Sequence, residues 1–234
     1  MLLGAAQGVH WLLFFLAVEH GSVALAVLTF YTAPVFIALA APVVLHERLS
    51  RLALGALVLG GAGVALVAAD APRGGGYSAA AVAAGLGSAL SYAALVILSK
   101  RLLTRRAEPL TVAFWDCFVG ALVVAPVLLV AGRVLPQGTD EWAVVLLLGV
   151  VFSGLATLVY ALLLRHVRAQ TAGILTFLEP VAAVLLAALL LDDPLAVRTL
   201  FGGALVVVSG IAVVWLEPTD SATAAVAPVG SGGS

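Results

Sequence analysis

Long apolar runs separated by short polar segments occupy the chain from residue 2 to residue 216. A helix needs about 20 largely apolar residues to cross the hydrocarbon core of a bilayer. Cutting the chain at charged and turn-forming residues gives eight such runs, at residues 2–18, 22–45, 52–69, 77–99, 110–132, 142–164, 170–191 and 198–216. Because lipid-facing backbone must satisfy its own hydrogen bonds, and the alternation typical of barrel strands is absent from the sequence, the pattern predicts an all-α membrane protein with about eight transmembrane helices.

Composition indicates that most of this chain is surrounded by the lipid bilayer, which is therefore its expected partner. Hydrophobic residues make up 63% of the sequence and charged residues 10%, whereas soluble domains average about 45–50% and about 25%. A soluble fold of this size cannot hide that much apolar surface. The net charge of −1 and the lack of a basic segment argue against a nucleic-acid partner. Cys117 is the only cysteine, so an intrachain disulfide is excluded.

The charges between the runs predict an orientation. With both termini in the cytoplasm, eight Lys and Arg residues lie in inside loops and three in outside loops, as the positive-inside rule requires. The N-terminus lacks the basic segment of a cleavable signal peptide, so the first run is interpreted as a mature transmembrane helix. Arginine greatly outnumbers lysine, which hints at a GC-rich bacterial genome. We therefore expect a multi-pass protein of the bacterial cell (inner or plasma) membrane.

The two halves of the sequence resemble each other. Residues 17–36 align with residues 163–183, and the register continues beyond them. The aligned pairs are His20 with His166, Pro34 with Pro180, and Glu47 with Asp193. Each copy has a short polar turn, a long helix with a central proline, an acidic turn and a glycine-bearing helix. The corresponding turns lie on opposite sides of the predicted membrane, which indicates inverted repeats of the kind that support alternating access. A chance match between helices of similar composition is the alternative.

The repeat predicts a division of the chain. Residues 1–70 form an incomplete first repeat of three spans, residues 77–216 form a second repeat of five, and two further spans are expected before Met1. Residues 71–76, APRGGG, are expected to be a flexible external loop between the halves. Residues 217–234 are rich in Ala, Ser, Thr, Gly and Pro, and we expect them to be a disordered tail.

Residues 31–67 and 177–214 carry a family resemblance, because each combines a proline-bearing helix, an acidic turn and a glycine-rich last helix. Together with residues 85–102, they resemble the EamA-type branch of the drug/metabolite transporter superfamily. The resemblance implies ten helices in two inverted five-helix repeats around a central cavity, and secondary transport with export of amino acids or related metabolites by alternating access. The alternatives are a truncated inactive protein, a structural subunit that needs a partner, and a lipid-linked flippase subunit.

Glu179 is the leading candidate for function. It lies about ten residues into its run, or roughly 15 Å from the run's start, and therefore near the midplane. An unpaired carboxylate is costly there, which favours a proton-linked or ammonium-binding role over a structural one. Thr176 lies on the same face, one turn earlier. Pro34 and Pro180 each leave a carbonyl without its donor, so they are predicted hinges, the alternative being kinks satisfied by neighbouring helices.

Polar and aromatic side chains at helical spacing complete the predicted substrate site, which adds His10, Trp11, Tyr31, Thr32, Ser91, Tyr92, Trp115 and Tyr160. His10 is explained equally well as a packed, hydrogen-bonded residue, and hydroxyls more often join helices than bind ligands. Asp116 is interpreted as a residue that reaches water or pairs with Arg105 or Arg106. Glycines are expected to pack helices closely, and Glu47 is expected to be a turn residue and helix cap.

Enzyme chemistry is not indicated. The sequence has no HExxH or GxSxG motif, no metal-ligand cluster and no phosphate-binding glycine loop. We therefore expect a protein that is not an enzyme and needs no cofactor or metal. Its expected partners are the bilayer and a small-molecule solute, with proton coupling and a homodimer as compatible additions.

Overall fold

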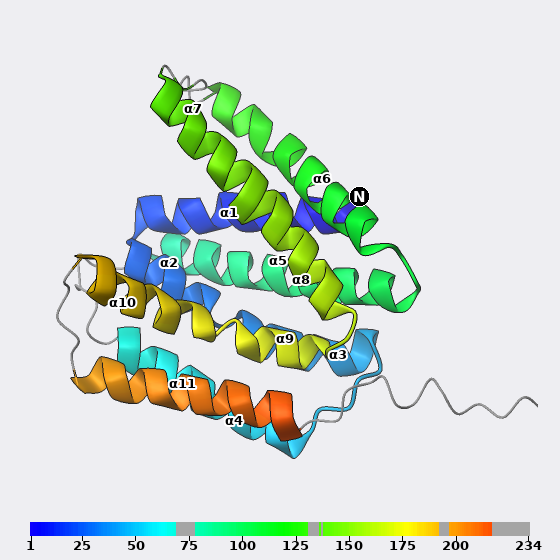
Figure 1. Ribbon diagram of the computed structural model, residues 1–234, viewed down its shortest axis with the longest axis vertical. Helices are drawn as coiled ribbons and strands as arrows, with labels where there is room; N and C mark the ends of the chain where they lie inside the picture. Colours follow the sequence, from blue (N-terminus) through cyan, green and yellow to red (C-terminus); the bar gives the residue numbers. More distant parts are fainter. Residues whose placement is uncertain (69–77, 131–135, 137, 192–196, 217–234) are drawn as a thin grey trace, which may run out of the picture.

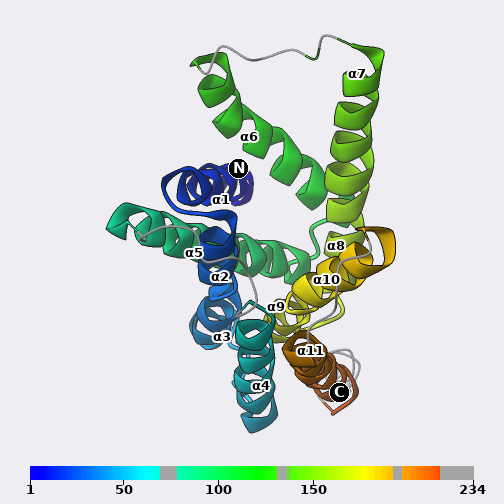
Figure 2. The same ribbon diagram turned by 90° about the vertical axis from the view of Figure 1, so that its left-hand side faces the viewer.

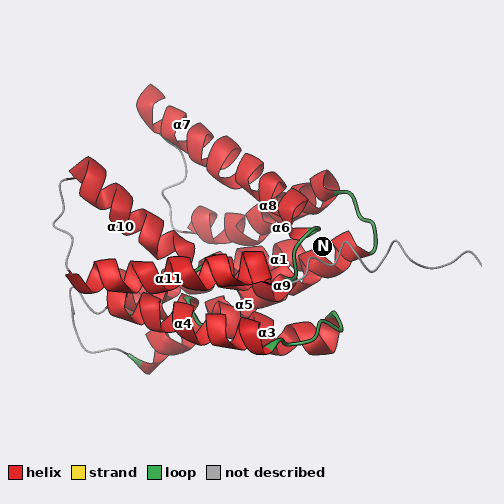
Figure 3. Ribbon diagram, turned by 60° about the horizontal axis from the view of Figure 1, so that its bottom comes forward, coloured by secondary structure: helices red, strands yellow, loops and turns green. Residues whose placement is uncertain are grey.

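The computed structural model describes residues 1–68, 78–130, 136, 138–191 and 197–216, and within them it contains helices and connecting turns but no strand (Figures 1 and 3). The helices are α1 Leu2–His20, α2 Val23–Phe30, α3 Ala33–Val44, α4 Arg51–Ala68, α5 Ala79–Thr104, α6 Pro109–Val130, α7 Thr139–Leu146, η1 Leu147–Leu155, α8 Ala156–Leu164, α9 Ala169–Leu175, α10 Leu178–Leu191 and α11 Val197–Leu216. The predicted all-α class is confirmed.

Five segments are long and apolar enough to cross a membrane among the described residues. They are Leu2–His20, Leu25–Val44, Ala79–Thr104, Pro109–Val130 and Thr139–Leu164. Arg51–Leu66 and Leu200–Val213 are shorter apolar helices. The protein is therefore a multi-pass, all-α membrane protein. The predicted loop at 71–76, the tail at 217–234 and Asp193 lie outside the described residues.

Two of the predicted helices are interrupted. The run at residues 22–45 divides into α2 and α3 at Tyr31 and Thr32, and the run at 170–191 divides into α9 and α10 at Thr176 and Phe177. Figure 1 shows α2–α3 running from left to right and α9–α10 running from right to left. The two broken helices are thus antiparallel, and α3 packs against α9.

Close helix contacts use the glycines that the sequence singled out. α1 packs on α5 and α6, and a Cβ at Gly8 would lie only 2.5 Å from the Cβ of Val123 on α6. α4 packs along α11 (Figure 2), where a Cβ at Gly63 would lie 2.5 Å from the carbonyl oxygen of Gly202. These glycines allow the backbones to approach, because no side chain separates them.

The described core has two main parts. One surrounds Ile37 of α3, Val96 of α5 and Leu164 of α8, and the other surrounds Phe177 and Val206 between α9, α4 and α11. In contrast, α7 and η1 contain no buried residue, and Figure 2 shows their hairpin with α6 extending away from the other helices. The packed region therefore contains the broken helices.

Candidate functional site

Each helix break precedes a proline that begins a new helix. Pro34 lies in the first turn of α3 and Pro180 in the first turn of α10, where a missing N–H is tolerated because those donors have no partner within the helix. The backbone tightens at both breaks. The N–H of Thr32 donates to the Thr29 carbonyl over 3.1 Å, and that of Glu179 donates to the Thr176 carbonyl over 3.1 Å. The two prolines therefore account for both interruptions.

A polar cavity of 290 Å³ lies beside the second break. Residues of α1, α5, α6, α8 and α10 line it. Its polar lining consists of Gln7, Tyr92, Ser99, Asp116, Thr157, Tyr160 and Glu179. Gln7 comes from residues 1–70 and the others from residues 77–216, so both predicted repeats contribute to the wall, as expected of a substrate cavity in an inverted-repeat transporter.

The N-terminal end of α10 influences the charge state that Glu179 favours. Glu179 is in the first turn of α10, which begins at Leu178 directly after the break. The N-terminus of a helix carries partial positive charge, which favours a carboxylate. An interrupted helix thus offers Glu179 a stabilisation that a continuous helix at this depth would not provide.

Four of the predicted residues gather around this cavity. Tyr92, Tyr160 and Glu179 line it, and the Tyr92 side chain lies next to Thr176 and Tyr160. Tyr31, at the first break, is within electrostatic range of Glu179, and its ring centroid lies 6.4 Å from that of Phe177 at the second break. The structure therefore brings both breaks and the cavity into one neighbourhood.

His10 and Trp11 do not line the cavity. The Nδ1 atom of His10 lies 2.8 Å from the Ser88 hydroxyl, and the ring packs among aromatic rings with a centroid 5.1 Å from that of Phe30 and 5.4 Å from that of Tyr92. This position matches the packed, hydrogen-bonded alternative. Trp11 is 43% exposed on the surface of α1.

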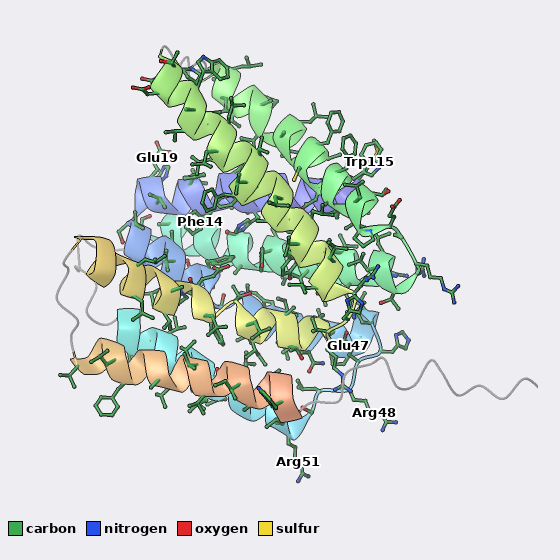
Figure 4. All side chains as sticks on the ribbon, viewed as in Figure 1. Phe14, Glu19, Glu47, Arg48, Arg51 and Trp115 are labelled. Carbon is green, nitrogen blue, oxygen red and sulfur yellow. The ribbon has the colours of Figure 1, made fainter. Side chains whose placement is uncertain are left out.

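Three other predicted residues also have local partners. The Thr32 hydroxyl donates to the Thr29 carbonyl over 2.6 Å, and the Ser91 hydroxyl donates to the Ala6 carbonyl over 2.8 Å, which joins α5 to α1. Trp115 lies on the outer side of α6 in Figure 4, in contact with the rings of Phe114 and Phe118. None of the three lines the cavity.

Asp116 corrects an expectation from the sequence. It is 5% exposed and lines the cavity, whereas the sequence suggested that it reaches water or pairs with Arg105 or Arg106. Gln7 was also missed as a site residue, although its helical spacing relative to His10 placed it on a polar face. The sequence did contain a signal for Asp116: at 1.5 Å per residue it lies about 10 Å into α6, which places it well inside the membrane-spanning segment.

Comparison with known proteins agrees with this architecture. Relatives include an "Uncharacterized transporter" of Archaeoglobus fulgidus, 30% identical over 86% of this chain and 70% of the relative, and the "Biotin transporter" of Escherichia coli, 30% identical over 58% of this chain and 48% of the relative. The "Uncharacterized transporter YxxF" of Bacillus subtilis is 26% identical over 76% of this chain and 57% of the relative. The chain thus spans about half the length of the last two.

A solved structure described only as the crystal structure of a protein has the same fold, with a TM-score of 0.78, 22% identity and coverage of 90% of this chain and 74% of the other. The profile of the EamA-like transporter family matches residues 1–69 and 79–216. This match extends over both broken helices and every residue that lines the cavity. The chain belongs to the EamA-like transporter family.

Proposed function

We propose that this protein is a secondary transporter that exports small metabolites, amino acids or related solutes, across the bacterial cell membrane by alternating access. The observation that carries the proposal is a polar cavity beside two antiparallel broken helices. Transporters with inverted repeats commonly place the substrate where such helices break, because the free helix ends and carbonyls can interact with polar solutes. Residues 1–70 and 77–216 are the two halves that move against each other.

The breaks supply the hinges of the proposed cycle. Pro34 has no N–H to donate to the Phe30 carbonyl, so α2 and α3 are joined by fewer backbone hydrogen bonds than a continuous helix. Pro180 has the same effect between α9 and α10. Each half-helix can therefore tilt while its own hydrogen bonds stay intact, and the cavity opens to one side at a time.

The charge distribution supports both termini in the cytoplasm. Arg48 and Arg51 lie at the same end of the molecule as Glu47, and Glu19 lies at the opposite end (Figure 4). Positive charge at one end is the pattern that the positive-inside rule predicts for the cytoplasmic side. In this orientation Glu179 faces the middle of the transport path, where it takes up a proton or holds an amino group of the solute.

Flux through reconstituted protein tests the function. Liposomes that contain the purified chain are expected to exchange radiolabelled amino acids, and Glu179→Gln is expected to lower the rate at least tenfold, because glutamine keeps the shape of the side chain but neither its charge nor its proton. Glu19→Gln, at an exposed position on α1, is the control and should leave flux unchanged. Folded protein that moves no solute of this class would contradict the proposal and favour a subunit that needs a partner.

A further inference from the structure

Asp116 adds a second carboxylate to the cavity that Glu179 lines. It comes from α6 and is 5% exposed, and among the described residues its Oδ1 atom has no hydrogen-bond partner. The Oε1 atom of Gln7 is buried around the same cavity, also without a partner among the described residues, and the Tyr160 hydroxyl lies beside Tyr92 in the same wall. Polar atoms of α1 and α6 that face one space without a protein partner make that space suited to a polar solute, because native proteins rarely leave buried polar groups unpaired.

The charge of that ligand follows from the cavity wall. The described lining holds two carboxylates, four hydroxyls and one amide, and it contains no Lys, Arg or His. Lys100, a buried cation on α5 outside the lining, donates hydrogen bonds to the carbonyls of Leu164 and Val167. Buried carboxylates need compensating positive charge. That charge must therefore come from protons or from the solute.

We propose that the solute carries a protonated amine, which binds between Asp116 and Glu179, while its remaining polar groups meet Gln7 and Tyr160. This inference rests on the transport function proposed above and names its substrate class. An ammonium group offers three donors and no acceptor, which suits a wall of carboxylates and hydroxyls. A solute whose only charge is negative finds two carboxylates and no cation on the described wall.

A metal ion fits the cavity less well than an amine. Within the described residues no group of three or more His, Cys, Asp or Glu side chains is placed to hold a metal. Two carboxylates and neutral hydroxyls, in a space of 290 Å³, suit a small organic cation better. The volume also limits the solute to a small metabolite.

Two probes of matched shape test the inference without any variant. Phenethylamine and 3-phenylpropionate share a skeleton and differ in the charge of the end group. The thermal unfolding midpoint of the purified protein in detergent is expected to rise with phenethylamine and to saturate, as mass action requires for a ligand of the folded state, and to stay unchanged with 3-phenylpropionate. Equal stabilisation by both compounds, or stabilisation by the acid alone, would overturn the proposal.

Asp116→Asn then tests the residue itself. The half-saturating concentration of phenethylamine should rise at least tenfold, whereas Asp140→Asn, an exposed acid in the first turn of α7, should leave it unchanged. A monodisperse Asp116→Asn protein with unaltered amine affinity would refute the assignment. If this variant does not fold, the wild-type probe pair still decides. Amine binding without flux would leave the inference standing and refute transport, and flux of acids without amine binding would do the reverse.

Discussion

Glu47 shows how one side chain connects the two halves of the chain. Its carboxylate oxygens accept the N–H of Ala169 over 3.1 and 3.2 Å, at the start of α9. The sequence predicted a cap at Glu47, and the capped helix is one from the second half. Lys100 acts on the same turn from the other side, because its Nζ donates to the Val167 carbonyl over 2.6 Å. The turn between α8 and α9 is therefore held by one acid and one base.

Removing the Glu47 carboxylate should destabilise the protein. Glu47→Ala leaves the Ala169 N–H without this acceptor and removes a negative charge from the start of α9, a loss of about 1–2 kcal/mol by the usual cost of deleting a helix cap. Thermal unfolding in detergent measures the change. Glu47→Gln keeps one acceptor oxygen and should lose less, and Glu19→Gln should lose nothing. Equal stability of the alanine variant and the wild type would show that the cap is not needed.

The residues of the site were only partly predictable from the sequence. Glu179 was singled out because depth along a span can be counted, and a carboxylate at that depth is expensive. Asp116 was placed wrongly because counting gives depth but not which neighbouring helices cover a face. Whether the face of α6 that carries Asp116 is buried depends on how α1, α5 and α8 pack around α6. Those contacts join residues far apart in the sequence. The contact of His10 with Ser88, 78 positions later, could not be read from the sequence for the same reason.

At the scale of helices, the prolines in the sequence indicated where a helix could kink. The sequence did not show that each of these helices divides into two. An apolar run of sufficient length predicts a continuous helix, and both broken runs have that length. The structure interrupts each helix two to four residues before its proline, where the backbone changes to hydrogen bonds that span three residues. The local effect of each proline explains why the helix is interrupted. The position of the interruptions beside a cavity depends on tertiary packing.

Pro180→Ala tests whether the second break serves transport. Alanine restores a donor that can reach the Thr176 carbonyl and extends α10 backward, so the helix becomes stiffer and the unfolding midpoint should not fall. Flux in liposomes is expected to fall several-fold, because the half-helices no longer tilt freely. The affinity for a bound amine should change less than the flux. Pro126→Ala, at a proline inside α6, is the control. Unchanged flux in Pro180→Ala would refute the hinge.

At the scale of the molecule, helices from the two halves of the chain pack against each other in pairs. α4 ends the described part of the first half and α11 ends that of the second, and the two pack along each other. α3 and α9, which belong to the two broken helices, form a second pair. Such contacts are what the predicted inverted repeat leads one to expect, since equivalent elements of inverted repeats pack against each other. The contact between α4 and α11 therefore matters for assembly of the whole protein.

Gly63 and Gly61 provide a matched test of that contact. A Cβ at Gly63 would lie 2.5 Å from the Gly202 carbonyl oxygen and 2.7 Å from a methyl carbon of Val206, whereas a Cβ at Gly61 meets nothing within 4 Å. Gly63→Leu should therefore separate α4 from α11, and the purified protein should lose its monodisperse peak in size-exclusion chromatography or unfold at a lower temperature. Gly61→Leu adds the same apolar bulk to a side that faces open space, and it should behave like the wild type.

Equal behaviour of the two leucine variants would show that the α4–α11 contact does not hold the halves together. A defect in Gly63→Leu alone would establish that it does, because both substitutions change helix propensity and hydrophobicity equally.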